Sequence, residues 1–190
     1  MSQKIIESIS FTNINFLIKP LAQNEYEKCK FTSCIFSEAD LTDLIFIDCE
    51  FKSCDFSMAK IINTSFRGSK FINCKMLGLN FNNCDAFLLA LNFEDCKLNL
   101  SSFYKLKLKK TEFINCSLHE TDFTQADLTG SLFENCDLTK AIFQNSILEK
   151  TDFSTSYNFT IDPETNKVKK AKFSSNGLAG LLEKYDIDVV

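Results

Sequence analysis

Large apolar residues recur at every fifth position along most of this chain. From Phe11 to Phe81 each such position holds Phe or another large apolar residue, and from Phe93 to Phe153 Phe and Leu alternate strictly. The position two residues before most of them is small or weakly polar, and the other three are mostly polar. All nine cysteines occupy the small position: Cys29, Cys34, Cys49, Cys54, Cys74, Cys84, Cys96, Cys116 and Cys136.

A period of five fits neither an α-helix nor a β-strand, whose side chains repeat at 3.6 and 2 residues. The simplest alternative is a chain that turns a corner every five residues and sends one large and one small residue inward. Six cysteines fall at intervals of 20, except for one interval of 22 between Cys74 and Cys96. This predicts four sides per coil and a two-residue insertion within residues 82–92.

Stacked coils of this kind would enclose one continuous apolar column. The predicted core comprises Phe36, Phe56, Phe93, Phe103, Phe113, Phe123, Phe133, Phe143 and Phe153, together with Cys34, Cys54, Cys74, Cys96, Cys116 and Cys136.

Several five-residue units carry a further signature, with Ala or Cys, then Asp, then Leu or Phe. Examples are residues 39–43, 54–58, 126–130 and 136–140. Over residues 29–156 the chain resembles the pentapeptide-repeat proteins. The resemblance implies an all-β fold, a right-handed quadrilateral β-helix with four units per coil. We therefore expect an irregular N-terminal coil or cap with degenerate repeats over 1–28, the β-helix over 29–156, and a loop, last repeats, helix and tail over 157–190.

The C-terminal segment is predicted to close one end of the column. Residues 177–185 read as a short amphipathic helix, and residues 187–190 form an apolar tail. The open end of a solenoid needs a cap or a partner, so the segment would either cap its own chain or form a two-fold dimer contact. The candidate dimerisation residues are Leu178, Leu181, Leu182, Tyr185, Ile187 and Val189.

Residues 157–190 resemble the tail of one subgroup of pentapeptide-repeat proteins. That subgroup contains the quinolone-resistance, microcin-immunity and albicidin-resistance proteins. The resemblance implies a head-to-head homodimer whose rod imitates duplex DNA and binds DNA gyrase or topoisomerase IV.

Composition narrows the possible functions. The chain has 190 residues with 21 basic and 25 acidic side chains, a formal charge of −4, so no general affinity for nucleic acid is expected. No apolar run approaches the length of a membrane span, and the N-terminus lacks the apolar stretch of a signal peptide. We expect a cytoplasmic protein without direct nucleic-acid or membrane binding.

Candidate catalytic chemistry is sparse. The cysteines lack the spacing of zinc knuckles and occupy the inward small position, so they read as buried apolar side chains. The single histidine, His119, follows Leu118 and should point outward. With five glycines the chain has no convincing phosphate loop. The sequence therefore predicts a protein that is not an enzyme and has no metal or cofactor.

Charge is distributed in zones along the sequence. Residues 31–60 carry six acids and two lysines, residues 111–153 eight acids and two lysines, and residues 61–110 eight bases and three acids. The basic zone is densest at Lys105, Lys107, Lys109 and Lys110. A solvated surface with chance clustering is one interpretation. The other is that acidic zones occupy clefts built for DNA phosphates, through Asp40, Asp43, Asp48, Glu50, Asp55, Asp122, Asp127, Asp137 and Asp152.

Two hypotheses follow. The first is a dimeric protein that binds a type II topoisomerase such as DNA gyrase and protects it from a poison by imitating DNA. The second is an interaction scaffold whose protein partner is not a topoisomerase.

Overall fold

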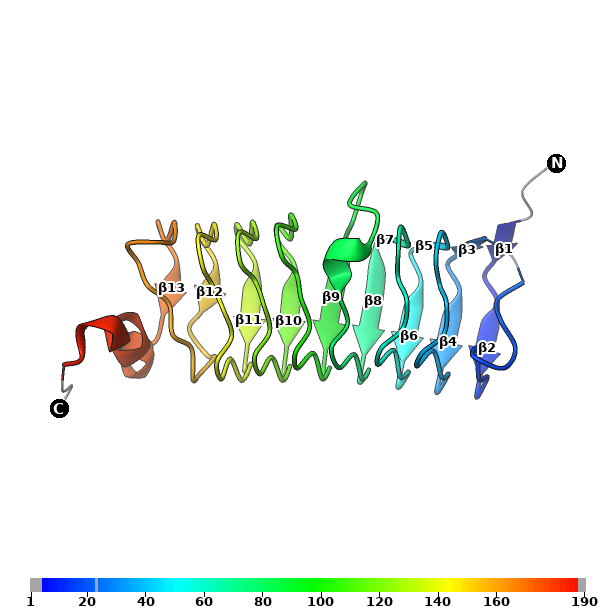
Figure 1. Cartoon of the computed structure of the whole chain (residues 1–190), viewed down its shortest axis with the longest axis horizontal. Helices are drawn as coiled ribbons and strands as arrows, with labels where there is room; N and C mark the ends of the chain where they lie inside the picture. The colour runs from blue at the N-terminus through cyan, green and yellow to red at the C-terminus, as the bar shows by residue number, and fades with distance from the viewer. Residues whose placement is uncertain (1–4, 23, 188–190) are drawn as a thin grey trace.

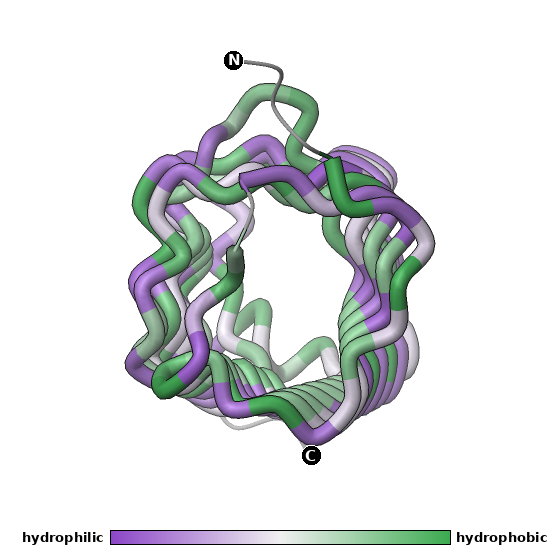
Figure 2. Tube along the Cα trace, turned by 90° about the vertical axis from the view of Figure 1, so that its right-hand side faces the viewer, coloured by the Kyte–Doolittle hydropathy of each residue, from purple (hydrophilic) through white to green (hydrophobic). Residues whose placement is uncertain are grey.

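The computed structural model describes residues 5–22 and 24–187 as one column of stacked coils (Figure 1). Viewed along its long axis, the coils superpose as a four-sided tube (Figure 2). None of the helices among these residues is long and apolar enough to cross a membrane. We number the sides walls 1 to 4 in the order in which the chain meets them, with Ile6 on wall 1, Phe11 on wall 2, Phe16 on wall 3 and Leu21 on wall 4.

Two of the walls contain β-strands. Wall 1 has a four-stranded parallel sheet: β1 (Ile5–Glu7), β3 (Glu25–Glu27), β5 (Ile45–Ile47) and β7 (Ser65–Arg67). Wall 2 has a nine-stranded parallel sheet: β2 (Ser10–Thr12), β4 (Lys30–Thr32), β6 (Glu50–Lys52), β8 (Ser69–Ile72), β9 (Leu91–Glu94), β10 (Glu112–Ile114), β11 (Leu132–Glu134), β12 (Asp152–Phe153) and β13 (Lys172–Phe173). Walls 3 and 4 are held by isolated parallel bridges such as Asp55↔Lys75 and Asp40↔Lys60.

Partners in neighbouring coils are 20 residues apart, as in Phe31↔Phe51 and Phe113↔Phe133. Across the insertion the interval is 22, from Phe71 to Phe93. The register confirms the predicted all-β, four-sided β-helix.

The corners explain why the chain needs so few glycines. At almost every fifth residue the backbone adopts a positive φ, and the residue is rarely Gly; Met58 has φ 59° and Leu100 has φ 62°. The Asp before many inward residues stabilises the following turn, because its Oδ1 accepts a hydrogen bond from the backbone N–H two residues on, 2.8 Å for Asp55 and Ser57. The Asp of the five-residue signature therefore has a structural task.

Many of the small inward residues carry a hydrogen-bond donor. The Cys49 thiol donates to the carbonyl oxygen of Tyr26, 3.3 Å away, and the Thr64 hydroxyl donates to that of Leu41, 2.8 Å away. Cys, Ser and Thr are thus interchangeable here because each can satisfy a carbonyl in the preceding coil. All nine cysteines are free and buried. Burial raises the pKa of Cys49 to about 12, which makes this thiol a poor nucleophile.

Aromatic rings fill the column in stacks that run along its axis. Phe36 and Phe56 stack with centroids 4.4 Å apart, and Phe103 meets Phe113 edge-on at 5.9 Å. Every Phe and Cys of the predicted core lies in the interior, with at most 4% of its surface exposed.

The regular coil extends further toward the N-terminus than the sequence interpretation placed it. Ile6 lies in register with Tyr26, and the rings of Phe11 and Phe31 stack at 4.8 Å. Ile6, Phe11 and Phe16 therefore continue the stacks of the next coil, whereas Leu17 and Ile18 remain exposed. Residues 1–4 lie outside the described part of the chain.

The insertion forms a loop that rises from the middle of wall 1, above β8 and next to the short 3-10 helix η1 (Phe81–Asn83) (Figure 1). Asp85 N–H donates to the carbonyl oxygen of Thr64 at 2.9 Å, and Ala90 N–H to that of Phe66 at 3.1 Å. Both ends of the loop are thus fixed to wall 1, while Phe87 and Leu88 are 64% and 63% exposed.

The C-terminal helix begins earlier than expected and is divided in two. The structure has two 3-10 segments, η2 (Ser175–Leu181) and η3 (Glu183–Tyr185). The Ser174 side chain caps η2 by accepting a hydrogen bond from Gly177 N–H. Two glycines within residues 175–181 lower the preference for an α-helix.

Candidate interaction surfaces

The acidic residues singled out by sequence are distributed around the whole column. Asp40 and Asp122 lie on wall 4, Asp55 and Asp137 on wall 3, Glu50 and Asp152 on wall 2, and Asp127 on wall 1. Asp43 and Asp48 occupy the corners that follow walls 4 and 1. The structure does not bring these nine carboxylates together on one face.

Several of these carboxylates are paired with a lysine in an adjacent coil. The Nζ–Oδ distances are 3.8 Å for Lys60–Asp40, 3.4 Å for Lys75–Asp55, 3.2 Å for Lys109–Asp127 and 2.8 Å for Lys172–Asp152. Within the described residues, Asp43, Asp48, Glu50 and Asp122 have no such ion pair. Among the nine candidates, these four are the carboxylates without a basic partner.

Asp137 lies at the centre of a small polar network on wall 3. Its Oδ2 is 2.7 Å from His119 Nε2, and its Oδ1 accepts hydrogen bonds from Thr139 and Asn158. Partial burial alone would raise the pKa of Asp137, but the hydrogen bonds from Thr139, His119 and Asn158 lower it to about 2. His119 lies half-buried at the surface and pairs with this carboxylate.

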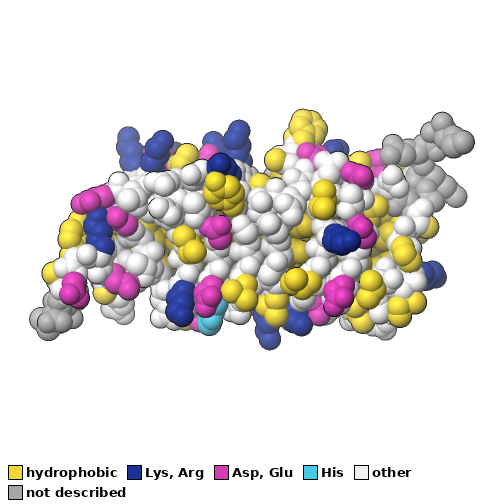
Figure 3. Space-filling model, viewed as in Figure 1, with side chains coloured by type: hydrophobic (Ala, Val, Ile, Leu, Met, Phe, Trp, Pro, Cys, Tyr) yellow, Lys and Arg dark blue, Asp and Glu magenta, His cyan; other side chains and the backbone are white. Residues whose placement is uncertain are grey.

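Wall 1 has a concentration of lysines that the sequence zones did not reveal. Bridges align Lys107 with Asp127, Ile147 and Lys167 in successive coils. The remaining lysines lie two or three residues after one of these aligned positions. The set that we call the basic half-wall comprises Lys107, Lys109, Lys110, Lys150, Lys167, Lys169 and Lys170, all exposed. Basic side chains gather along the upper edge of the molecule in Figure 3. The 20-residue repeat of the sequence already aligns these lysines in successive coils, whereas a count of charges along consecutive residues does not separate one wall from another.

The C-terminal helices pack closely against the last coils. A Cβ on Gly180 would collide with the Phe159 carbonyl oxygen, so only glycine fits there. Lys184 Nζ is 2.7 Å from both Asp162 and Glu164, and the Tyr185 hydroxyl donates to Glu164 at 2.8 Å. These contacts give the segment the geometry of an intramolecular cap.

Among the candidate dimerisation residues, Leu181 packs against the core, and Leu182 is partly buried. Leu178, Tyr185 and Ile187 remain 47%, 50% and 56% exposed. Val189 lies outside the described residues. The exposed trio is what the cap leaves available to a second molecule.

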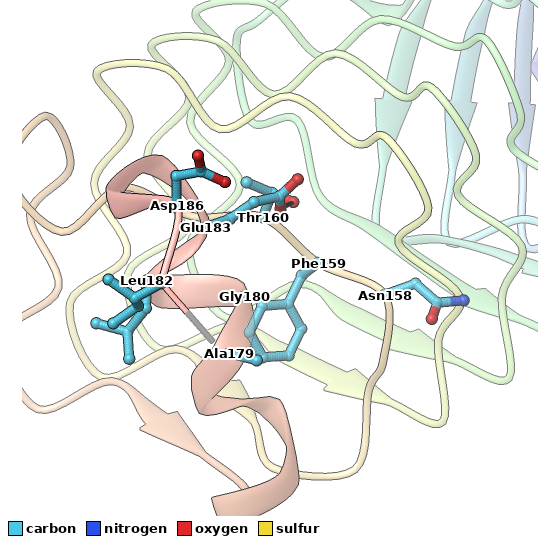
Figure 4. Close-up of a pocket in the computed structure, with 9 residues that line it drawn as sticks. Asn158, Phe159, Thr160, Ala179, Gly180, Leu182, Glu183 and Asp186 are labelled. Carbon is cyan, nitrogen blue, oxygen red and sulfur yellow. Dashed lines mark hydrogen bonds between the residues drawn. The ribbon is translucent and has the colours of Figure 1, made fainter. Parts of the chain in front are cut away.

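A cleft of about 520 Å³ separates the C-terminal helices from the last coil (Figure 4). It is lined mainly by Phe159, Gly180, Leu182 and Glu183, and the Thr160 hydroxyl donates to Glu183 across it. Neither Cys nor His lines the cleft. It is the seam between the cap and the column, and its polar side chains include Thr160, Glu183 and Asp186.

Comparison with family models matches most of the column. The model described as "Pentapeptide repeat region" matches residues 64–143 and 86–158, which overlap and together span half of the chain. A second model, "Pentapeptide repeats (8 copies)", matches residues 27–60. The chain belongs to the pentapeptide-repeat family. No curated protein matches it.

Solved structures share the architecture of this pentapeptide-repeat rod. Two trypsin-treated variants of QnrB1, described as a plasmid-mediated fluoroquinolone resistance protein, match with TM-scores of 0.64 and 0.59 at 20% and 21% sequence identity. The matches cover 96% and 98% of this chain and 99% and 100% of the QnrB1 chains. The likeness establishes a common fold over nearly the full length of both chains.

Across residues 5–22 and 24–187, no three His, Cys, Asp or Glu side chains are grouped so that they could hold a metal ion. The cysteine columns face the core, where their thiols donate to backbone carbonyls.

Proposed function

We propose that this pentapeptide-repeat rod is a non-catalytic protein that binds a type II topoisomerase and protects it from fluoroquinolone-type poisons. The observation that carries the proposal is the match to QnrB1, a fluoroquinolone resistance protein, over 96% of this chain and 99% of that one. The match thus extends over a rod of comparable length, rather than over a few shared coils.

The proposed contact depends on rod shape together with a few carboxylates. Nine stacked strands spaced by about 4.8 Å make a rod roughly 40 Å long. Asp43, Asp48 and Glu50 lie in neighbouring corners and strands of the N-terminal half and lack ion-pair partners in the described chain. Negative groups held on a rigid rod are attracted to a cleft that normally receives DNA phosphates. We include these three residues in the proposed contact.

A supercoiling assay tests the proposal. DNA gyrase or topoisomerase IV inhibited by a fluoroquinolone should recover activity when the rod is added. The triple variant Asp43→Asn, Asp48→Asn, Glu50→Gln should protect about three- to tenfold less well, because it removes unpaired negative charge from the contact. The matched control, Glu25→Gln, Glu38→Gln, Glu112→Gln, changes net charge equally at other exposed or half-buried positions and should protect like the native chain. Failure of micromolar rod to bind either enzyme or to alter its inhibition would reject the proposal.

The proposed rod acts as a homodimer joined at its C-terminal ends. The exposed trio Leu178, Tyr185 and Ile187 forms an apolar area beside the cap, and such areas commonly mark protein contacts. Leu178→Ser with Ile187→Ser should halve the mass measured by light scattering without changing the melting temperature. An unchanged mass, whether the native chain is monomeric or dimeric, would refute this role for the trio.

The alternative is a scaffold for a protein other than a topoisomerase. One observation favours it: the candidate carboxylates are spread over four walls, and four of the nine are paired with lysine. A uniformly acidic DNA mimic would leave them free. If the supercoiling assay fails while the acidic triple variant still abolishes binding to another purified partner, the scaffold becomes the better account.

A further inference from the structure

Wall 1 changes its charge at the protruding loop. Before the loop, exposed or half-buried positions carry four acids and two bases: Glu7, Glu25, Glu27, Lys28, Asp48 and Arg67. After it, the basic half-wall presents seven exposed lysines against Asp127 and Glu149. In the described chain only Lys109 of the seven has an ion-pair partner. Positive charge is therefore concentrated on one half of one wall of a protein whose net charge is −4.

The loop places an apolar knob at the end of this half-wall. Phe87 and Leu88 are among the most exposed large apolar side chains of the rod. The Arg67 guanidinium lies 5.5 Å from the Phe87 ring centroid and 3.9 Å from Asp85 Oδ2, contacts that orient the loop. In Figure 3 an apolar knob rises from the upper edge beside the basic side chains.

We propose that the basic half-wall and the Phe87–Leu88 knob form a docking surface for an acidic segment of a partner protein. Apolar side chains of the segment would contact Phe87 and Leu88, and its carboxylates would face the unpaired lysines. This surface lies on wall 1 and does not include Asp43, Asp48 or Glu50, so the inference stands or falls independently of the topoisomerase proposal.

A protein segment fits this surface better than a nucleic acid does. The lysine columns extend over three coil steps, about 14 Å at strand spacing. A phosphate backbone continuing along the wall would then meet Glu25, Glu27 and Asp48, and duplex DNA carries a charge about every 1.7 Å. Leucine offers no ring for base stacking, whereas apolar anchors beside complementary charges are typical of protein contacts. A protein segment can restrict its carboxylates to the length of the half-wall.

Fluorescence anisotropy on the full chain tests the docking surface. The probe is a short labelled peptide of Asp and Glu with Phe and Leu at one end, compared with the same peptide carrying Ser in place of Phe and Leu. We expect the first peptide to bind more tightly, and its affinity to fall with added salt. Lys110→Gln, Lys150→Gln, Lys170→Gln should weaken binding about tenfold. Phe87→Ser should remove the preference between the two peptides.

Matched variants guard against effects of net charge or exposed apolar area. Lys30→Gln, Lys52→Gln, Lys97→Gln makes the same charge change at exposed positions on walls 2 and 3, and Ile62→Ser removes an exposed apolar side chain from wall 4. Both should bind like the native chain. Equal loss in the control set, or no peptide binding at low ionic strength, overturns the proposal. Tighter binding of single-stranded DNA, duplex DNA or phosphatidylserine vesicles than of the peptide overturns it as well. So does self-association of the rod, if added salt weakens it and the triple lysine variant no longer shows it.

Discussion

The two halves of the rod solve the same packing problem with different arrangements of aromatic rings. In the N-terminal half, up to Met76, aromatic residues line three adjacent walls, as in Phe46, Phe51 and Phe56. In the C-terminal half, residues 93–161, Phe lines the opposite walls 2 and 4, and Leu lines the other two. One cross-section therefore tolerates both arrangements, because each combines large and smaller groups that fill the same space.

The corners differ between the halves as well. Tight corners close with a hydrogen bond from the small residue to the preceding inward residue, 3.0 Å for Ala39 N–H and Phe36 O. At corners that follow strands, the small residue is usually Cys, and the N–H is used differently: Cys74 N–H donates to Cys96 Sγ at 3.4 Å. The N-terminal half has cysteine corners after walls 1 and 2, and strands on both walls. The C-terminal half has them after wall 2 alone, and its strands are confined to that wall.

The largest expected effect comes from placing a charge in either aromatic arrangement. Phe123→Asp should prevent folding, because it buries a carboxylate among the rings of Phe103, Phe113 and Phe143 without a partner. Circular dichroism and gel filtration measure the outcome. A soluble, folded variant would mean that position 123 tolerates water.

Truncation of one ring in each half compares the two arrangements directly. Phe51 has close edge-on neighbours on both adjacent walls, Phe46 at 5.3 Å and Phe56 at 5.2 Å. The walls adjacent to Phe123 hold Leu, and its edge-on neighbours are the more distant Phe113 and Phe133 on the opposite wall, at 5.8 and 5.7 Å. Phe51→Ala and Phe123→Ala should each lower the free energy of unfolding by about 3–5 kcal/mol. The loss should be larger at Phe51 by about 0.5–1.5 kcal/mol, the contribution of aromatic pairs beyond burial. Equal losses in urea denaturation would show that ring arrangement is energetically neutral.

Cysteine corners can be tested one atom at a time. Cys96 Sγ accepts from Cys74 N–H and donates to the Phe71 carbonyl oxygen at 3.4 Å. Cys96→Ala removes both interactions and should cost about 1–3 kcal/mol, since it leaves buried backbone groups without partners. Cys96→Ser should cost less, because Ser156 already performs this role for Cys136 N–H at 3.1 Å. A serine variant as unstable as the alanine variant in urea would contradict this account.

Sequence periodicity predicted the architecture because one spacing controls both the corners and the core. A period of five and a repeat of 20 were enough to predict that the core Phe residues from Phe36 to Phe153 and the aligned cysteines point inward. Charge placement could not be predicted in the same way, because Lys107 and Lys167 share a column although 60 residues separate them. Likewise, Asp55 and Asp127 read as surface charge in sequence, whereas in the structure they close turns and pair with lysines.

Acid should destabilise the C-terminal half through Asp137. Folding lowers the pKa of this carboxyl to about 2, against about 3.9 in an unfolded chain. The unfolded state therefore binds the proton more readily, so the stabilisation is complete above about pH 4 and is lost as pH falls toward 2, about 2 kcal/mol in total. Asp137→Asn should flatten this part of the curve of unfolding free energy against pH. An unchanged curve would mean that the network with His119 and Asn158 does not form in solution.

The smallest expected effect concerns the left-handed corners, which both halves share. Met58 and Leu100 are largely exposed and adopt φ 59° and 62°, a conformation that costs a residue with a Cβ about 1 kcal/mol relative to glycine. Met58→Gly and Leu100→Gly should each change the unfolding free energy by less than about 1 kcal/mol, because relief of strain is offset by the greater flexibility of glycine in the unfolded chain. Gly130→Ala is the reverse test: its φ is 71°, and an added Cβ would meet only Lys110 Cγ at 3.8 Å, so no steric clash adds to the balance between backbone strain and unfolded-chain flexibility. If Gly130→Ala proved stabilising by urea denaturation, the strain of the corner would be smaller than the entropy that glycine costs, and the scarcity of glycine at these corners would itself stabilise the rod.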